Sequence, residues 1–283
     1  MLLISTGLFQ NQTAIQAIQH LSSEGIRAIE LSAGRYSADL IDDLKKVSQD
    51  FTLFVHNYFP PAEEPFVFNL ASFEAKTVQK SLDHAKTAIR LSVELGNPVY
   101  SFHAGYLLAL QPTDLGKQLN RKKLEDREVC LTVFIERVCS LAEFARKEGV
   151  ELLIENNVLS QANYEAYQAN PFLVVTADEA EYVMKNTPDN VNLLMDVAHL
   201  KVSAHSLGFD AEQMLHRCHP WIRAYHLSDN DGISDSNDNI TVDSWFWTLL
   251  KRDYLFCTLE IRDTSIINLI DQYNLVIFNL GCV

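Results

Sequence analysis

One unit repeats along the chain: a short apolar run, followed by a stretch in which apolar residues recur at helical spacing. Eight of these runs are predicted to be strands, at residues 2–9, 26–31, 51–55, 99–102, 150–154, 191–196, 222–225 and 254–259. Most of them are apolar throughout and do not alternate with polar residues, which is typical of parallel strands that are covered on both faces. The repeat therefore predicts an α/β fold with a parallel sheet.

The number of units decides which parallel fold is expected. Eight strand–helix units in a chain of 283 residues predict a (β/α)8 TIM barrel, with a doubly wound open sheet as the alternative. No GxGxxG or GxxxxGK[ST] sequence follows any run, which excludes the usual dinucleotide and P-loop sites. No linker-like or low-complexity segment interrupts the repeat. We expect a single barrel domain over residues 1–283.

The helical stretches between the runs would form the outer layer of this barrel. Their spacing predicts a long helix from about residue 72, a short helix over 245–250 and a closing helix from about residue 264. Thr176 begins a sequence that resembles a capping box, with Glu179 three residues later.

The charge of the chain bears on its partners. A formal net charge of −14 argues against a protein that holds nucleic acid mainly through phosphate contacts. A local basic patch could offset this charge, and the only candidate is the run Lys117, Arg121, Lys122 and Lys123.

Cysteine spacing and hydropathy bear on location. The five cysteines show no CxxC spacing and are expected to be reduced thiols. The first residues lack the basic start of a signal peptide, and no apolar run approaches the roughly 20 residues of a membrane-spanning helix. We expect a cytoplasmic protein with no membrane segment. The sequence leaves the oligomeric state open, including a homo-oligomer.

Polar residues stand at the carboxyl ends of the predicted strands. In a barrel these ends meet on one face, which is where the catalytic groups of such enzymes lie. The residues concerned are His56, His103, Glu155, Asp196, His199, His226 and Glu260. Any one of them could be a hydrogen-bonded rim residue. Together, however, the last four strands would bring three carboxylates and one imidazole to one place.

Such a group needs a compensating charge. Three carboxylates at close range repel and raise one another's pKa, and a divalent cation supplies the missing positive charge. Three carboxylates and one histidine suit Mn²⁺, Mg²⁺, Co²⁺ or Zn²⁺ and leave coordination positions open for substrate oxygens. The sequence therefore predicts one divalent metal ion, with a solvated acidic rim as the alternative.

The motifs around these residues resemble those of the xylose-isomerase-like TIM barrel superfamily. This group contains sugar isomerases and epimerases and also the endonuclease IV type of apurinic endonuclease. The resemblance spans nearly the whole chain. It rests on Leu153-Ile154-Glu155-Asn156, Met195-Asp196-Val197-Ala198-His199, His226-Leu227-Ser228-Asp229 and Leu259-Glu260-Ile261, and also on His56-Asn57-Tyr58, Phe68-Asn69-Leu70-Ala71-Ser72 and Phe102-His103-Ala104-Gly105.

The resemblance implies a role for each site residue. Glu155, Asp196, His226 and Glu260 would bind the metal, with Mn²⁺ as the first expectation. Glu155 and Glu260 would also act as the acid/base pair that moves a proton between neighbouring carbons of a sugar or sugar phosphate, through a metal-stabilised enediolate. His199 would orient a substrate oxygen. His56 and His103 would either line the sugar pocket or bind a second metal with Glu155.

Two alternatives stay open. The endonuclease branch uses three zinc ions and adds two histidines on strands three and four, which His56 and His103 match. It also has an Asp-x-His in the loop after strand seven, where this chain has Asp235 and Asn237. An asparagine carbonyl is a poor zinc ligand, so a third zinc site is not expected. The other alternative is a metal-dependent dehydratase of a polyol or keto acid on the same barrel.

Overall fold

The chain forms a closed barrel of parallel strands. The computed structural model describes residues 1–120, 122–262 and 265–281. Strands β1 to β8 follow one another in chain order, and β8 pairs with β1 to close the barrel. This confirms the barrel and excludes the open sheet. The strands are β1 (Leu2–Ser5), β2 (Ala28–Leu31), β3 (Thr52–His56), β4 (Val99–His103), β5 (Glu151–Glu155), β6 (Val191–Asp196), β7 (Ile222–Leu227) and β8 (Phe256–Leu259).

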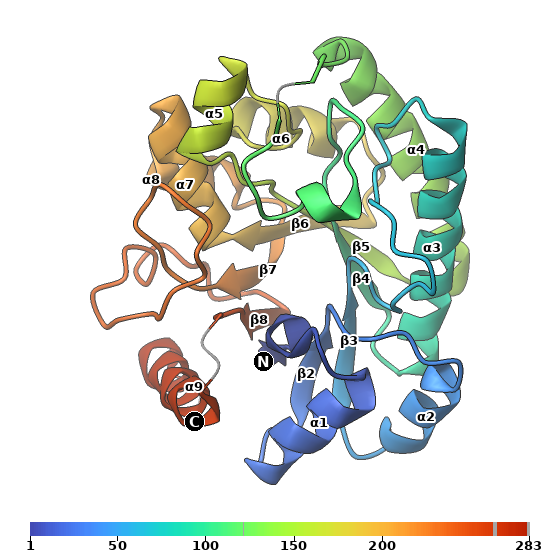
Figure 1. Cartoon of the computed structure of the whole chain (residues 1–283). Coiled ribbons are helices and arrows are strands. Elements are labelled where there is room, and N and C mark those ends of the chain that lie inside the picture. Colours follow the sequence, from blue (N-terminus) through green and yellow to red (C-terminus); the bar gives the residue numbers. More distant parts are fainter. Residues whose placement is uncertain (121, 263–264, 282–283) are drawn as a thin grey trace.

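Helices lie around the strands, as Figure 1 shows. Within the described ranges, no helix is long and apolar enough to cross a membrane. The helices are α1 (Ala14–Ser23), α2 (Leu40–Val47), α3 (Ala75–Glu94), α4 (Arg127–Glu148), α5 (Gln161–Tyr167), α6 (Ala177–Lys185), α7 (Val197–Leu207), α8 (Ala211–Cys218) and α9 (Ile266–Leu280), with short 3-10 turns η1 (Thr6–Phe9) and η2 (Pro112–Asp114).

The predicted helix over 245–250 does not form. This segment folds as consecutive turns, and residues 228–255, all of which are described, contain no helix. Ser244 Oγ accepts a hydrogen bond from Thr241 N at 3.0 Å and donates to Asp229 Oδ2 at 2.6 Å, while Trp247 Nε1 donates to Thr241 O at 2.7 Å. These side-chain bonds tie the segment to the loop after β7 and compete with helical backbone bonds.

The predicted capping box at Thr176 is also absent. Helix α6 begins directly after Thr176, but the threonine side chain makes no capping hydrogen bond. Glu179 Oε2 instead accepts from Val174 N at 2.5 Å and from Arg127 Nη2 at 3.0 Å. The carboxylate that would complete the box is therefore engaged in an ion pair with α4.

Two layers of side chains fill the barrel. The lower layer is apolar and consists of Leu3, Phe54, Val99, Leu153, Leu194, Ala224 and Phe256. Successive side chains of a strand point to opposite faces, so the residue two positions further on returns to the interior. Those residues are polar and buried: Ser5, His56, Ser101, Glu155, Asp196, His226 and Thr258. The strand repeat itself thus places a polar layer on an apolar floor.

A close contact joins the loops after β3 and β4. Asn69 Nδ2 donates to Tyr106 O at 3.0 Å, and Asn69 Oδ1 accepts from Tyr106 N at 3.1 Å and from Ala71 N at 2.9 Å. Gly105 lies so near that a Cβ atom added to it would stand 2.6 Å from Ala71 Cβ. No larger residue fits at position 105 unless this contact moves.

We expect Gly105→Ala to lower the free energy of unfolding by about 1–3 kcal/mol, since the added methyl group overpacks the contact. Urea denaturation measures this change. Adding Ala71→Gly removes the opposing methyl group and should recover part of the loss, which a double-mutant cycle detects. A Gly105→Ala protein as stable as the wild type would show that position 105 has room for a side chain and would contradict the close contact with Ala71.

Candidate metal centre and active site

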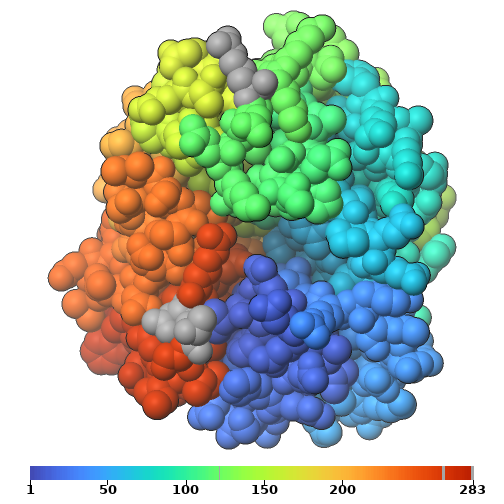
Figure 2. All heavy atoms as spheres, viewed as in Figure 1, coloured from blue at the N-terminus to red at the C-terminus, as the bar shows by residue number. Residues whose placement is uncertain are grey.

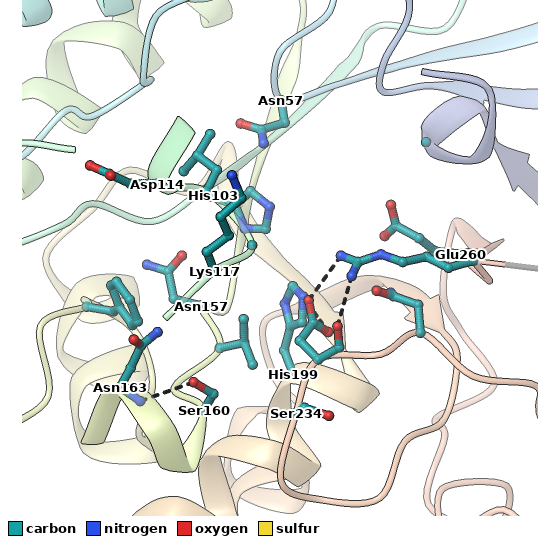
Figure 3. A pocket seen from close by; sticks show the side chains of 18 of the residues that line it. Asn57, His103, Asp114, Lys117, Asn157, Ser160, Asn163, His199, Ser234 and Glu260 are labelled. Atoms are coloured by element: carbon teal, nitrogen blue, oxygen red, sulfur yellow. Dashed lines mark hydrogen bonds and ion pairs between the residues drawn. The ribbon is translucent and has the colours of Figure 1, made fainter. Parts of the chain in front are cut away.

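A cavity of about 490 Å³ opens at the carboxyl ends of the strands. The space-filling view shows the hollow between the segment after β4 and the N-terminal segments (Figure 2). His103, His199 and Glu260 extend into this cavity (Figure 3). The polar layer of the barrel therefore lies directly beneath an open space that a ligand can enter.

The four predicted metal ligands come together at the floor of this cavity. One side-chain atom each from Glu155, Asp196, His226 and Glu260 lies within 4.8 Å of all the others. His226 Nδ1 is 2.9 Å from Glu260 Oε2, 3.2 Å from Glu155 Oε1 and 3.9 Å from Asp196 Oδ2. Three of the four side chains are buried, and only Glu260 is partly exposed, at 25%.

This donor set fits a divalent cation. Both carboxylate oxygens of Glu155, Asp196 Oδ2 and His226 Nδ1 are buried and have no hydrogen-bond partner among the described residues. Buried polar atoms in folded proteins are normally satisfied. Oxygen and imidazole donors only a few ångströms apart can coordinate one such ion. A solvated acidic rim is excluded, because Glu155 and Asp196 are closed off from solvent.

The electrostatics show how strongly the group needs positive charge. Burial raises the pKa of Asp196 to about 7. Burial also works against charge on Glu155 and Glu260, but neighbouring histidines hold the pKa of Glu155 well below its usual range, and His226 lowers the pKa of Glu260 to about 2. Burial by itself would lower the pKa of His226, but the carboxylates of Glu30, Glu155 and Glu260 raise this pKa well above its usual value. A bound cation would replace the proton on His226 as the compensating charge.

A second group shares Glu155. His56 Nε2 lies 3.3 Å and His103 Nδ1 lies 3.2 Å from Glu155 Oε2, while Glu155 Oε1 faces His226. His56 Nδ1 is held by Ser101 Oγ at 2.9 Å. Burial lowers the pKa of His103 to about 4, so this imidazole is neutral at physiological pH. Glu155 thus presents one oxygen to each of two groups that could bind a metal.

His199 occupies the edge of the site. Asp196 Oδ1 caps α7 by accepting from His199 N at 2.7 Å, which explains the spacing of three residues between them. His199 Nδ1 bonds Asn156 O at 3.0 Å, and Nε2 lies 3.7 Å from Asp196 Oδ2 and 3.6 Å from Asp235 Oδ1. Burial disfavours its charge, but the neighbouring carboxylates raise the pKa of His199 to about 9.

The loop after β7 adds Asp235 and Asn237 to the cavity wall. Asn237 is buried and donates from Nδ2 to Ser228 Oγ at 3.4 Å, and its Oδ1 has no hydrogen-bond partner within the described part of the chain. Asp235 lies 3.6 Å from His199 Nε2. The residue two positions later is Asn237, whose side-chain amide is a poor ligand for the third zinc ion that the endonuclease alternative requires.

A carboxylate accompanies the basic run after β4. Lys117 lines the cavity, whereas Lys122 Nζ pairs with Asp114 Oδ2 at 3.0 Å. Arg121 lies outside the described residues.

Sequence reasoning missed Glu30 on β2. This carboxylate is fully buried, and its Oε2 bonds both His226 Nε2 at 3.1 Å and Thr258 Oγ1 at 3.0 Å. An imidazole that donates from Nε2 leaves Nδ1 as an acceptor, which is the atom turned toward the other three ligands. The only signal in the sequence was a carboxylate within an otherwise apolar strand.

We expect Glu30→Gln to weaken divalent-metal affinity about tenfold, because the neutral amide no longer fixes and polarises His226 as a carboxylate does. Titration calorimetry with Mn²⁺ and Zn²⁺ measures the change. Glu151→Gln is the matched control: Glu151 starts β5 at the opposite end of the barrel, where it pairs with Arg223 at 3.0 Å. Equal affinities for both variants would refute the role given to Glu30.

Comparison with known proteins gives matches to structures and to a family. No curated protein matches the chain. A D-tagatose 3-epimerase-like protein has a TM-score of 0.74 at 16% identity, with 99% of this chain and 97% of the other covered. The IOLI protein with a bound zinc atom has a TM-score of 0.69 at 14% identity, with 99% of this chain and 98% of the other covered. A xylose isomerase-like TIM barrel protein from Mycobacterium smegmatis in complex with magnesium has a TM-score of 0.68 at 16% identity, with 98% of this chain and 96% of the other covered.

Similarity at this level of identity shows the fold. The family is shown by the sequence, because the model of the xylose isomerase-like TIM barrel family matches residues 18–274, which is most of the chain. The barrel, the polar layer at its carboxyl end and this match agree, and the chain belongs to the xylose isomerase-like TIM barrel family.

Proposed function

We propose that this protein is a divalent-metal-dependent isomerase or epimerase of a sugar or sugar phosphate. The observation that carries the proposal is the buried group of Glu155, Asp196, His226 and Glu260 at the floor of an open cavity. The similarity to a D-tagatose 3-epimerase-like protein supports a small carbohydrate as the partner. Action in the cytoplasm is part of the same proposal.

The metal would be held by these four side chains. When bound, it supplies a Lewis acid for the carbonyl and adjacent hydroxyl oxygens of the sugar. Mn²⁺ is the ion to test first, because three carboxylates and one imidazole form an oxygen-rich set. Zn²⁺ and Mg²⁺ come next, as structural relatives contain them.

Glu155 and Glu260 serve as the acid/base pair. Both carboxylates have lowered pKa values and are ionised, the state in which a base accepts a proton from carbon. Glu155 Oε1 and Glu260 Oε2 approach the same atom, His226 Nδ1, so the two groups border one small space. One carboxylate would remove the proton and the other would return one to the neighbouring carbon or the opposite face.

The three remaining histidines position the substrate. His103 is neutral, 22% exposed and directed into the cavity, so it can hydrogen-bond a sugar hydroxyl. His199, charged through its carboxylate neighbours, would orient a substrate oxygen. His56 lies deeper, against Glu155, and completes this wall.

We expect Glu155→Gln and Glu260→Gln to lower turnover at least about a thousandfold, because an amide cannot accept the proton from carbon. Incorporation of solvent deuterium into ketopentoses and ketohexoses, followed by proton NMR, measures this step without knowledge of the product. Melting curves and metal content of both variants separate lost proton transfer from lost fold or lost metal. Glu151→Gln serves as the control. Full exchange in either site variant would rule out its acid/base role.

An endonuclease IV-like activity is the second candidate, because His56 and His103 join Glu155 in a second group of potential ligands. The net charge of −14 and Asn237 beside Asp235 argue against it. A metal-dependent dehydratase of a polyol or keto acid would use the same four ligands.

Metal stoichiometry and an incision assay separate the two main candidates. We expect one tightly bound ion per chain in the wild type, its loss in Asp196→Ala and His226→Ala, and no incision of a duplex that contains an abasic site. Elemental analysis and gel electrophoresis measure these outcomes. Three zinc ions per chain together with robust incision would refute the isomerase or epimerase proposal and support the endonuclease IV-like activity.

A further inference from the structure

Helix α9 has two unlike sides. Its buried side packs on the barrel and consists of Leu269, Gln272, Val276 and Leu280. Its exposed side consists of Ile267, Asp271, Asn274 and Phe278. These four exposed residues are spaced by four, three and four positions, so they form one line along the helix. Figure 1 shows α9 at the outer edge of the barrel, with no element beyond it in this view.

The line on α9 is apolar at both of its ends. Among the described residues, the three most exposed large apolar side chains are Phe278 at 79%, Ile267 at 74% and Val242 at 61%. Single apolar residues on a surface are ordinary, but a group of them marks a surface that binds a partner. Two of these three side chains belong to α9.

The third side chain lies in a loop that is fixed to α9. Val242 belongs to the connection between β7 and β8. In this connection, Asn239 Oδ1 accepts a hydrogen bond from Asn268 Nδ2 at 2.8 Å, and Ile240 N donates to Gln272 Oε1 at 2.7 Å. The loop therefore borders α9 and extends the surface that the helix presents.

The charge of α9 favours a second copy of this chain as the partner. Asp271 is the only charged residue among the fifteen of the helix, whereas charged residues make up 21% of the whole chain. Two copies with a formal charge of −14 repel each other, so they can approach most closely through a face with few charges. A helix that binds anionic membranes or nucleic acid uses lysine and arginine, and α9 contains neither.

The order of residues along the line is self-complementary. If two copies of α9 pack antiparallel about a twofold axis between residues 272 and 273, Ile267 lies opposite Phe278 of the second copy. Asp271 then lies opposite Asn274, whose amide can donate a hydrogen bond to the carboxylate. Parallel packing would instead place Asp271 opposite Asp271, and like charges repel. The spacing of four, three and four is that of a seam between two nearly aligned helices.

We propose that the exposed face of α9 is the interface of a homodimer, in which the α9 helices of two copies pack antiparallel. Ile267 and Phe278 cover each other at both ends of the contact, and Asp271 and Asn274 set the register at its centre. The helix is about 22 Å long at 1.5 Å per residue, so the contact is smaller than a standard interface and the dimer is weak, with micromolar affinity. This dimer does not depend on the proposed function.

Sedimentation velocity of the full chain from about 2 to about 200 µM tests for this dimer, since association depends on concentration. The mean mass should rise from the 32.1 kDa of one chain toward twice that value. The rise should be larger at about 500 mM than at about 50 mM NaCl, because salt screens the repulsion between the two negatively charged copies. A monomer at every concentration would overturn the proposal.

Three variants locate the interface. Ile267→Asp and Phe278→Asp each bury a carboxylate against an apolar side chain, so each should weaken the dimer about tenfold or more. Tyr182→Asp is the matched control, because Tyr182 is 52% exposed on α6, and this change should leave the dimer intact. Melting curves by circular dichroism check that each variant is folded. A dimer that survives both α9 changes would overturn the assignment to this helix.

Disulfide cross-linking tests the antiparallel register. Cys139→Ser and Cys282→Ser form the background, since the other three cysteines are buried. Chains with Ile267→Cys and chains with Phe278→Cys are then oxidised separately and as a mixture. Only the mixture should give a covalent dimer, because positions 267 and 278 lie about 16 Å apart along one helix, beyond the reach of a disulfide. Covalent dimers of either chain alone would overturn the antiparallel arrangement.

Discussion

The mouth of the barrel depends on one buried carboxylate. The Glu155 side chain is closed off from solvent, and its two carboxylate oxygens have no hydrogen-bond partner within the described residues although they face imidazoles on both sides. An uncompensated charge in such a place would be costly. The polar layer around it, the protonation of His226 and the fit to a divalent cation all follow from the need to balance that charge.

Second contacts orient the imidazoles around Glu155. His226 is held by Glu30, His56 by Ser101 and His199 by the carbonyl of Asn156. In each case one ring nitrogen is engaged by the scaffold, so the other is directed at the site. Glu30 and Ser101 stand on strands and Asn156 directly follows β5, so these partners are held more rigidly than residues far out on loops. The loops instead form much of the cavity wall above these imidazoles.

Much of this arrangement was readable from the chain. The apolar runs predicted the strands. Glu155, Asp196, His226 and Glu260 were predicted as site residues because they end four of these strands, and parallel strands of a barrel end on one face. The missed features share one property: their partners are distant in sequence. Glu30 meets His226 across 196 residues, and Arg127 takes the Glu179 carboxylate across 52. The turns over 245–250 likewise replaced a helix because Ser244 bonds Asp229, which lies 15 residues earlier in the same β7–β8 connection.

The sequence by itself determined the barrel and its polar layer, since strand periodicity fixes which side chains point inward. Only the tertiary structure decided how these side chains divide into two groups that share Glu155, which nitrogen of each histidine faces the site, and which residues line the cavity above them. The physical reason is that tautomers, burial and cavity walls depend on contacts between separate strands and loops. No local pattern of residues encodes those contacts.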